Sequence, residues 1–218
     1  MNLLKENYIE IKNSLPEEVT LVAVSKTKPK QLIQELYDLG QRIFGENRIE
    51  ELVTKSIDLP KDIQWNMIGH LQSKKVKKIA SFITLIHSVD SFKLLKEIDK
   101  EAKKNNRTID CLLQFHIAQE ETKYGFELEE VVDIINSKDF EELKNIQIKG
   151  VMGMATFTNN TNIVREEFKK LKIISEKIKS YFPTASTISM GMSGDYKLAI
   201  EEGSTMIRVG SSIFGSRN

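Results

Sequence analysis

Short apolar segments rich in β-branched residues alternate with amphipathic segments along the chain. Strand patterns lie at residues 20–25, 43–44, 65–69, 82–88, 109–117, 147–154, 187–190 and 205–209. Helix patterns lie between them, at residues 29–40, 47–57, 73–80, 91–104, 127–138, 162–180 and 195–202. Regular alternation predicts parallel strands joined by crossover helices, and eight repeats of this unit favour a closed barrel.

The expected fold class is α/β, a single (β/α)₈ TIM-type barrel. An open doubly wound sheet is the structural alternative, and it would need a glycine-rich phosphate loop after the first strand. Here residues 26–29 (KTKP) follow that strand and contain no glycine. No linker or repeat divides the 218 residues, and 40% of them are apolar, so residues 1–218 are expected to form one domain.

Charge and cysteine content narrow the classes of function. The 32 basic and 31 acidic residues give a net charge of +1, which favours neither nucleic acid nor membrane as a partner. One cysteine, Cys111, allows no internal disulfide and suits a reducing compartment. No apolar run reaches the length of a membrane span, so we expect a cytoplasmic protein. His70, His87 and His116 lack metal-ligand spacing, and no metal site is expected.

Lys26 follows the first predicted strand. Side chains alternate between the faces of a strand, so Val22, Val24 and Lys26 share one face. If that face points inward, Lys26 lies at the catalytic end of the barrel, and partial desolvation would lower its pKa and favour the free amine that attacks aldehydes. A solvated lysine just beyond a strand is the alternative interpretation of this segment.

The last two predicted strands end in glycine-bearing turns. Residues 189–195 (SMGMSGD) lead into a helix, and residues 208–215 (RVGSSIFG) repeat the pattern. Many barrels bind phosphate at the loops after strands seven and eight, where backbone N–H groups can approach an anion. The segments therefore predict a phosphate site, with two ordinary tight turns as the alternative.

Arg208 is predicted to point into the barrel, because Met206, Arg208 and Gly210 share a face of the last strand. A buried arginine needs an anion or a strong acceptor, and a structural salt bridge would also satisfy it. Barrel closure places the last strand beside the first, so Arg208 and Lys26 are expected to flank one pocket. An amine, a phosphate cradle and an inward arginine match the requirements of pyridoxal 5′-phosphate (PLP).

Several short segments carry a resemblance to a known family. They are residues 23–27 (AVSKT), 44–48 (FGENR), 68–72 (IGHLQ), 120–125 (EETKYG), 189–193 (SMGMS) and 203–210 (GSTMIRVG). In this order they resemble the pyridoxal phosphate homeostasis protein family, and the resemblance covers nearly the whole chain. It implies a barrel like the N-terminal domain of alanine racemase.

The resemblance also implies roles for individual residues. Lys26 would form the internal aldimine with PLP, and Asn47 would line the cofactor. Ser193, Gly210 and Ser211 would hold the phosphate, and Arg208 would face the pyridine nitrogen. The sequence departs from the family's pattern at Asn66, Lys74 and His116, where the family usually has histidine, asparagine and asparagine.

The expected function is that of a PLP carrier and buffer that supplies apo-enzymes. Arginine cannot accept a proton, so Arg208 would leave the ring a weak electron sink. Alanine racemases also take a second acid or base from an added domain, which a chain ending at Asn218 is expected to lack, and we expect a monomer. The alternatives are a small PLP-dependent amino-acid racemase, with His70, His116 or Lys123 as a proton relay, and a phosphate-binding barrel without an imine.

Overall fold

The computed structural model describes residues 3–120 and 124–215, and within them eight parallel strands form a closed barrel. The strands are β1 (Thr20–Val24), β2 (Ile43–Glu46), β3 (Gln64–Met67), β4 (Leu85–Val89), β5 (Ile109–Gln114), β6 (Ile146–Met152), β7 (Thr187–Met192) and β8 (Met206–Val209). Each strand pairs with the next, and β8 pairs with β1. The (β/α)₈ TIM-type prediction is thereby confirmed.

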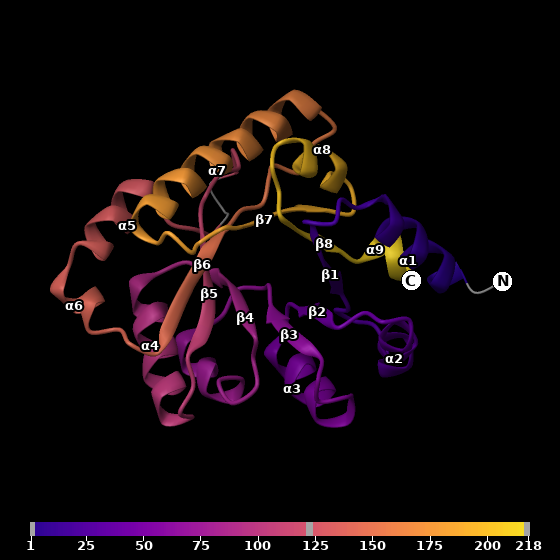
Figure 1. Cartoon of the computed structure of the whole chain (residues 1–218), viewed down its shortest axis with the longest axis horizontal. Helices are drawn as coiled ribbons and strands as arrows, with labels where there is room; N and C mark the ends of the chain where they lie inside the picture. Colours follow the sequence, from indigo (N-terminus) through magenta and orange to yellow (C-terminus); the bar gives the residue numbers. More distant parts are fainter. Residues whose placement is uncertain (1–2, 121–123, 216–218) are drawn as a thin grey trace.

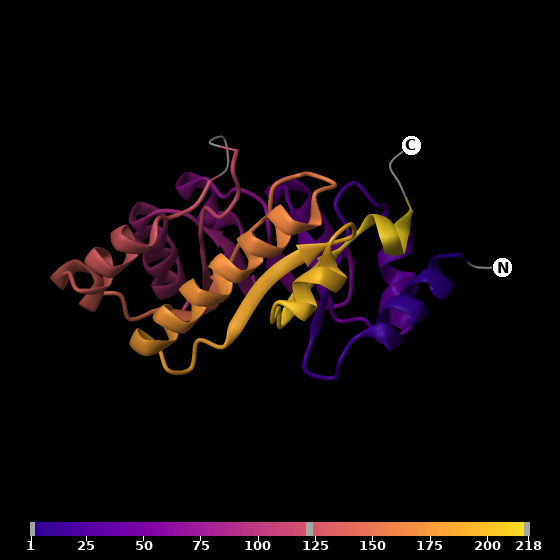
Figure 2. The same ribbon diagram turned by 90° about the horizontal axis from the view of Figure 1, so that it is seen from above.

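Helices follow the strands and surround the barrel (Figure 1). They are α1 (Leu3–Ser14), α2 (Lys30–Asp38), α3 (Ile49–Asp58), the 3₁₀ helix η1 (Ser73–Lys78), α4 (Phe92–Lys104), α5 (Leu128–Ile135), α6 (Lys138–Glu141), α7 (Thr161–Tyr181), α8 (Tyr196–Glu201) and α9 (Ser211–Phe214). The long helix α7 packs on β6 and β7 from outside the barrel (Figure 2). Within the described ranges, no helix has both the length and the apolar character needed to cross a membrane.

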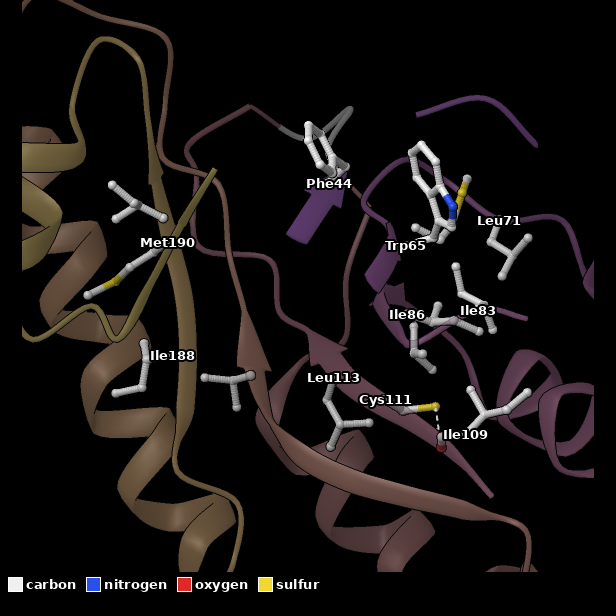
Figure 3. Packing of buried hydrophobic residues seen from close by; sticks show 14 of the residues in the cluster. Phe44, Trp65, Leu71, Ile83, Ile86, Ile109, Cys111, Leu113, Ile188 and Met190 are labelled. Carbon is white, nitrogen blue, oxygen red and sulfur yellow. Dashed lines mark hydrogen bonds between the residues drawn. The ribbon is translucent and has the colours of Figure 1, made fainter. Parts of the chain in front are cut away.

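The main hydrophobic core lies between the outer face of the barrel and the helices. Residues from β2 to β5 and from β7 contribute to it, as Figure 3 shows for Phe44, Trp65 and Ile188. Cys111 is fully buried in this layer, and burial raises the pKa of its thiol, so the predicted buried and inert cysteine agrees with the structure.

A second, smaller cluster fills the inside of the barrel. Leu85, Leu112 and Met152 form it, and Met206 packs against it. Nearer the carboxyl ends of the strands, the inward-pointing residues include the polar side chains of His87 and Arg208. These polar side chains lie above the apolar cluster, at the end where barrels of this type carry their sites.

Helix α1 is the largest element that the sequence interpretation missed. Its apolar residues Leu4, Tyr8 and Ile11 follow helical spacing, and Tyr8 and Ile11 are buried. The helix precedes the first strand and therefore lies outside the strand–helix alternation that guided the prediction. It packs against α9, which brings the two ends of the described chain together (Figure 1).

Two predicted boundaries also differ from the structure. The helix expected at 127–138 ends at Ile135. The Ser137 hydroxyl accepts a hydrogen bond from the Phe140 N–H at 3.2 Å and caps the N-terminus of a separate short helix, α6. The strand expected at 82–88 begins only at Leu85, since Ile83 still donates its N–H to the carbonyl of Ile79.

Candidate functional site

A cavity of about 400 Å³ opens at the carboxyl ends of the strands, within the roughly 300–1,000 Å³ typical of small-molecule sites. Its lining comes mainly from the segments that follow β1, β2, β7 and β8. All six residues predicted to contact the cofactor line it: Lys26, Asn47, Ser193, Arg208, Gly210 and Ser211. The fold thus brings distant segments to one place, while the part each residue plays toward a ligand stays a prediction.

Lys26 reaches the cavity because of the alternation of side chains in β1. Val22 is fully buried inside the barrel, Val24 lines the cavity floor, and Lys26 follows on the same face with a partly buried side chain. Ser25 points to the other side, where its hydroxyl contacts Glu46. The geometry therefore favours the inward lysine over the solvated one.

Arg208 points inward and is 4% exposed. Its Nη1 donates to the carbonyl oxygen and the Oγ of Ser189 at 2.8 and 2.6 Å, and its Nη2 donates to the carbonyl of Gly153 at 3.1 Å. Burial lowers the pKa of the guanidinium to about 10, with the Asp195 charge opposing the shift, so Arg208 is still cationic at neutral pH. All three acceptors are neutral groups, so these bonds orient the cation without neutralising it.

A buried hydrogen-bond chain continues from Arg208 into the barrel. Ser189 Oγ lies 3.0 Å from His87 Nδ1. The other ring nitrogen, His87 Nε2, is buried and has no hydrogen-bond partner among the described residues, so Ser189 is the polar contact that orients the imidazole. Burial, and secondarily the Arg208 charge, hold the pKa of His87 well below its usual 6.5, so the imidazole is neutral.

We expect His87 to make the folded protein less stable in mild acid. Below pH 6.5 the unfolded chain binds a proton on His87 that the folded chain rejects, so this contribution to stability is lost as the pH falls. Between about pH 7.5 and pH 5.5, the free energy of unfolding should drop by roughly 1.4 kcal/mol through this group. Urea unfolding at both pH values measures the drop. It should be smaller by that amount in His87→Gln, and an equal drop in both proteins would contradict the assignment.

The turns after β7 and β8 have the backbone geometry that the glycines suggested. Gly191 adopts φ +92°, and a Cβ there would lie 2.6 Å from the Ala199 side chain. Ser193 Oγ accepts hydrogen bonds from the backbone N–H groups of Gly210 at 3.2 Å and Ser212 at 3.3 Å. The two N–H donors thus converge on the Ser193 hydroxyl, which lines the cavity and joins the turns after β7 and β8.

Sequence reasoning missed several residues of the site. Ser212 was not predicted to take part in the site, although it directly follows Ser211 in the same turn. Asp195 also lines the cavity, accepts the Met192 N–H at 2.6 Å, and has a pKa that burial raises. The apolar walls come from Ile68, Met154, Phe157 and Met192. The sequence predicts that methionines near 152–154 and 190–192 pack the pocket wall, whereas Ile68 and Phe157 were not expected there.

The proposed proton-relay residues lie elsewhere. His70 is held by Asp90 at 2.9 Å and stacks on Tyr124, and His116 contacts the carbonyl of Glu120 at 2.9 Å. Neither histidine is among the residues that line the cavity. Lys123 lies outside the described residues.

Known proteins share both the sequence and the fold. The family described as "Alanine racemase, N-terminal domain" matches residues 1–218. A pyridoxal phosphate homeostasis protein from Aquifex aeolicus is 39% identical over 202 residues, which cover 90% of this chain and 86% of the relative. The chain belongs to the pyridoxal phosphate homeostasis protein family. The Escherichia coli K12 member of this family is 33% identical, with 93% of this chain and 88% of the relative covered.

Solved structures agree with this assignment. PipY of Synechococcus elongatus PCC7942 without PLP has a TM-score of 0.90 and 34% identity, with 97% of this chain and 100% of PipY covered. The PLP-bound form of PipY has a TM-score of 0.87. An alanine racemase of Clostridium difficile, at 15% identity, has a TM-score of 0.84 over 57% of its own chain, and it shows the fold alone.

The cavity fits the cofactor named for this family. An aldehyde needs an amine, which Lys26 offers, and a phosphate needs hydrogen-bond donors, which the Ser193 and Ser211 hydroxyls on the cavity lining offer. Residue 210 lies so close to β1 that an added Cβ would be 3.0 Å from the Val24 carbonyl oxygen. Arg208 remains cationic on the cavity wall.

Proposed function

We propose that this protein holds PLP as an imine on Lys26 and acts in intracellular PLP homeostasis as a carrier and buffer for apo-enzymes. The proposal is carried by one observation: Lys26, Arg208 and the turns that contain Ser193, Gly210 and Ser211 all line the same cavity. The names of the relatives and the PLP-bound form of PipY support it.

Each residue has a distinct task in this proposal. Bound PLP supplies an aldehyde carbon, and the Lys26 amine condenses with it and releases one water. The turns that carry Ser193, Gly210 and Ser211 hold the phosphate. Arg208 faces the pyridine nitrogen, and Asn47 lines the ring.

Arg208 favours holding the cofactor over turnover. Its pKa of about 10 keeps the guanidinium protonated at neutral pH, and a guanidinium offers only donors. A donor at the pyridine nitrogen leaves that nitrogen unprotonated and the ring a weak electron sink. We therefore propose that the protein is a carrier and has no enzymatic activity of its own.

Loading and release of PLP test this function. We expect the purified protein to turn yellow with PLP, borohydride to fix the label on Lys26, and unreduced cofactor to activate an added apo-aminotransferase. Mass spectrometry of the labelled peptide and the recovered transaminase activity are the measurements. A colourless protein would contradict PLP binding, and sustained racemisation of an amino acid that Lys26→Ala abolishes would favour the racemase alternative.

The remaining proposals concern the state of the protein in the cell. We propose that residues 1–218 act as one PLP-binding domain, that the protein is a monomer, and that it resides in the cytoplasm. The single buried Cys111 suits a reducing compartment. Sedimentation of the protein with and without PLP checks the monomer, and a stable dimer would contradict it.

A further inference from the structure

We propose that Lys55, Glu46 and Glu51 form a clamp that fixes the backbone on both sides of Lys26 and thereby aims its amine into the cavity. In this proposal Lys55 is a positioning residue that lies behind the barrel wall, outside the residues that line the cavity. The inference rests on the proposed imine at Lys26.

The first half of the clamp holds the peptide group that precedes Lys26. Lys55 Nζ, from α3, donates to the carbonyl oxygen of Ser25 at 2.8 Å. It also donates to Glu46 Oε1 at 2.8 Å and to Glu51 Oε2 at 3.1 Å, so its three N–H donors all have partners. The Ser25 hydroxyl donates to the same Glu46 oxygen at 2.6 Å. Residue 25 is thus held through its backbone and its side chain.

The second half holds the peptide group that follows Lys26. Glu51 Oε2, the oxygen that contacts Lys55, accepts a hydrogen bond from the Thr27 N–H at 2.7 Å. The carbonyl before Lys26 and the N–H after it are therefore bound by one connected set of charges. Rotation about the backbone of Lys26 would break at least one of these bonds.

The conformation of Thr27 shows why such a hold is needed. Thr27 has φ +64°, in the left-handed region that β-branched residues rarely adopt. A strained conformation of this kind persists only where neighbouring contacts enforce it. The Glu51 hydrogen bond is such a contact, and without it the turn from β1 to α2 could relax and carry Lys26 away from the inward face.

Burial separates this cluster from ordinary surface ion pairs. Glu46 is fully buried and Lys55 is 6% exposed, while the second oxygen of Glu46, Oε2, has no hydrogen-bond partner among the residues that the structure describes. A buried ion pair contributes little net stability because both charges lose their hydration. A role in fixing local geometry explains why two carboxylates and an ammonium are placed directly behind Lys26.

A pair of ligands separates lysine positioning from the integrity of the pocket. PLP forms an imine, whereas pyridoxine 5′-phosphate has an alcohol in place of the aldehyde and reports only on non-covalent binding. In Lys55→Met we expect PLP affinity and the rate of borohydride labelling at Lys26 to fall roughly tenfold or more. Affinity for pyridoxine 5′-phosphate should change less than about twofold.

Glu51→Ala provides a second variant, which removes the carboxylate that joins the Thr27 N–H to Lys55 and keeps the fully buried Glu46. Glu50→Ala is its matched control, because Glu50 is the preceding residue of the same helix and pairs with Lys75 at the surface. We expect the PLP-specific loss in Glu51→Ala but not in Glu50→Ala. If Lys55→Met does not fold, this comparison decides the inference.

The outcomes also separate the clamp from the proposed function. Equal losses for PLP and pyridoxine 5′-phosphate, or wild-type labelling rates in Glu51→Ala, would overturn the clamp and leave the imine intact. A wild-type protein that binds pyridoxine 5′-phosphate but never forms an imine would overturn the proposed function, and the clamp with it.

Discussion

Replacing Lys26 by alanine is expected to abolish borohydride-fixed PLP and to lower PLP affinity at least about 100-fold, or roughly 2.7 kcal/mol. The variant loses the amine that bonds the aldehyde, whereas the N–H groups of Gly210 and Ser212 and the Arg208 side chain remain in place. Residual non-covalent binding through the phosphate should persist, with the absorbance of the free aldehyde in place of that of the imine. Equilibrium dialysis and visible absorbance measure the two effects.

Lys74→Ala serves as the control for that loss. Lys74 is an exposed lysine of η1 that does not line the cavity. Its removal should leave PLP affinity and labelling at wild-type levels. Retention of the covalent label in Lys26→Ala would show that another lysine carries the imine and would refute the proposed function as stated.

Substitution of Gly150 by alanine is expected to destabilise the barrel by more than about 3 kcal/mol. Gly150 adopts φ +151° in β6, opposite Thr187 of β7. A Cβ at this position would lie 1.8 Å from the Thr187 carbonyl oxygen, which is backbone and cannot rotate away. The two strands would have to separate, with loss of their hydrogen bonds. Urea unfolding followed by far-ultraviolet circular dichroism measures the effect.

Gly194→Ala is the matched glycine control. Gly194 lies in the turn after β7, and an added Cβ would meet no heavy atom within 4 Å. Its free energy of unfolding should stay within about 0.5 kcal/mol of wild type. A wild-type free energy of unfolding in Gly150→Ala would contradict the close contact between Gly150 of β6 and the Thr187 carbonyl of β7.

Much of the fold and part of the site could be predicted from local patterns. The strand–helix alternation was enough for the barrel, because parallel strands with crossover helices have few compact solutions. Alternation within β1 and β8 was enough for the inward direction of Lys26 and Arg208, since side-chain direction in a strand has a period of two residues. Helix α1 was not predicted, because it precedes the first strand and therefore lies outside this alternation.

The contacts that organise the site were not predictable in the same way. Lys55 belongs to an amphipathic helix, and its spacing alone describes an ordinary surface lysine. Only packing of α3 against the barrel brings its ammonium 2.8 Å from the Ser25 carbonyl. The orientation of the His87 ring likewise depends on a contact with Ser189, which lies 102 residues away in the sequence.

Local patterns were enough to predict the order of strands and helices, the inward positions and the glycine turns, because each depends on residues close together in the chain. Which of those residues meet depends on how the strands and helices pack. Closure of β8 onto β1 sets Arg208 and Lys26 around one cavity, and the packing of α3 sets the charges behind Lys26. Burial and charge contacts of this kind depend on distances through space, which no local pattern of residues encodes.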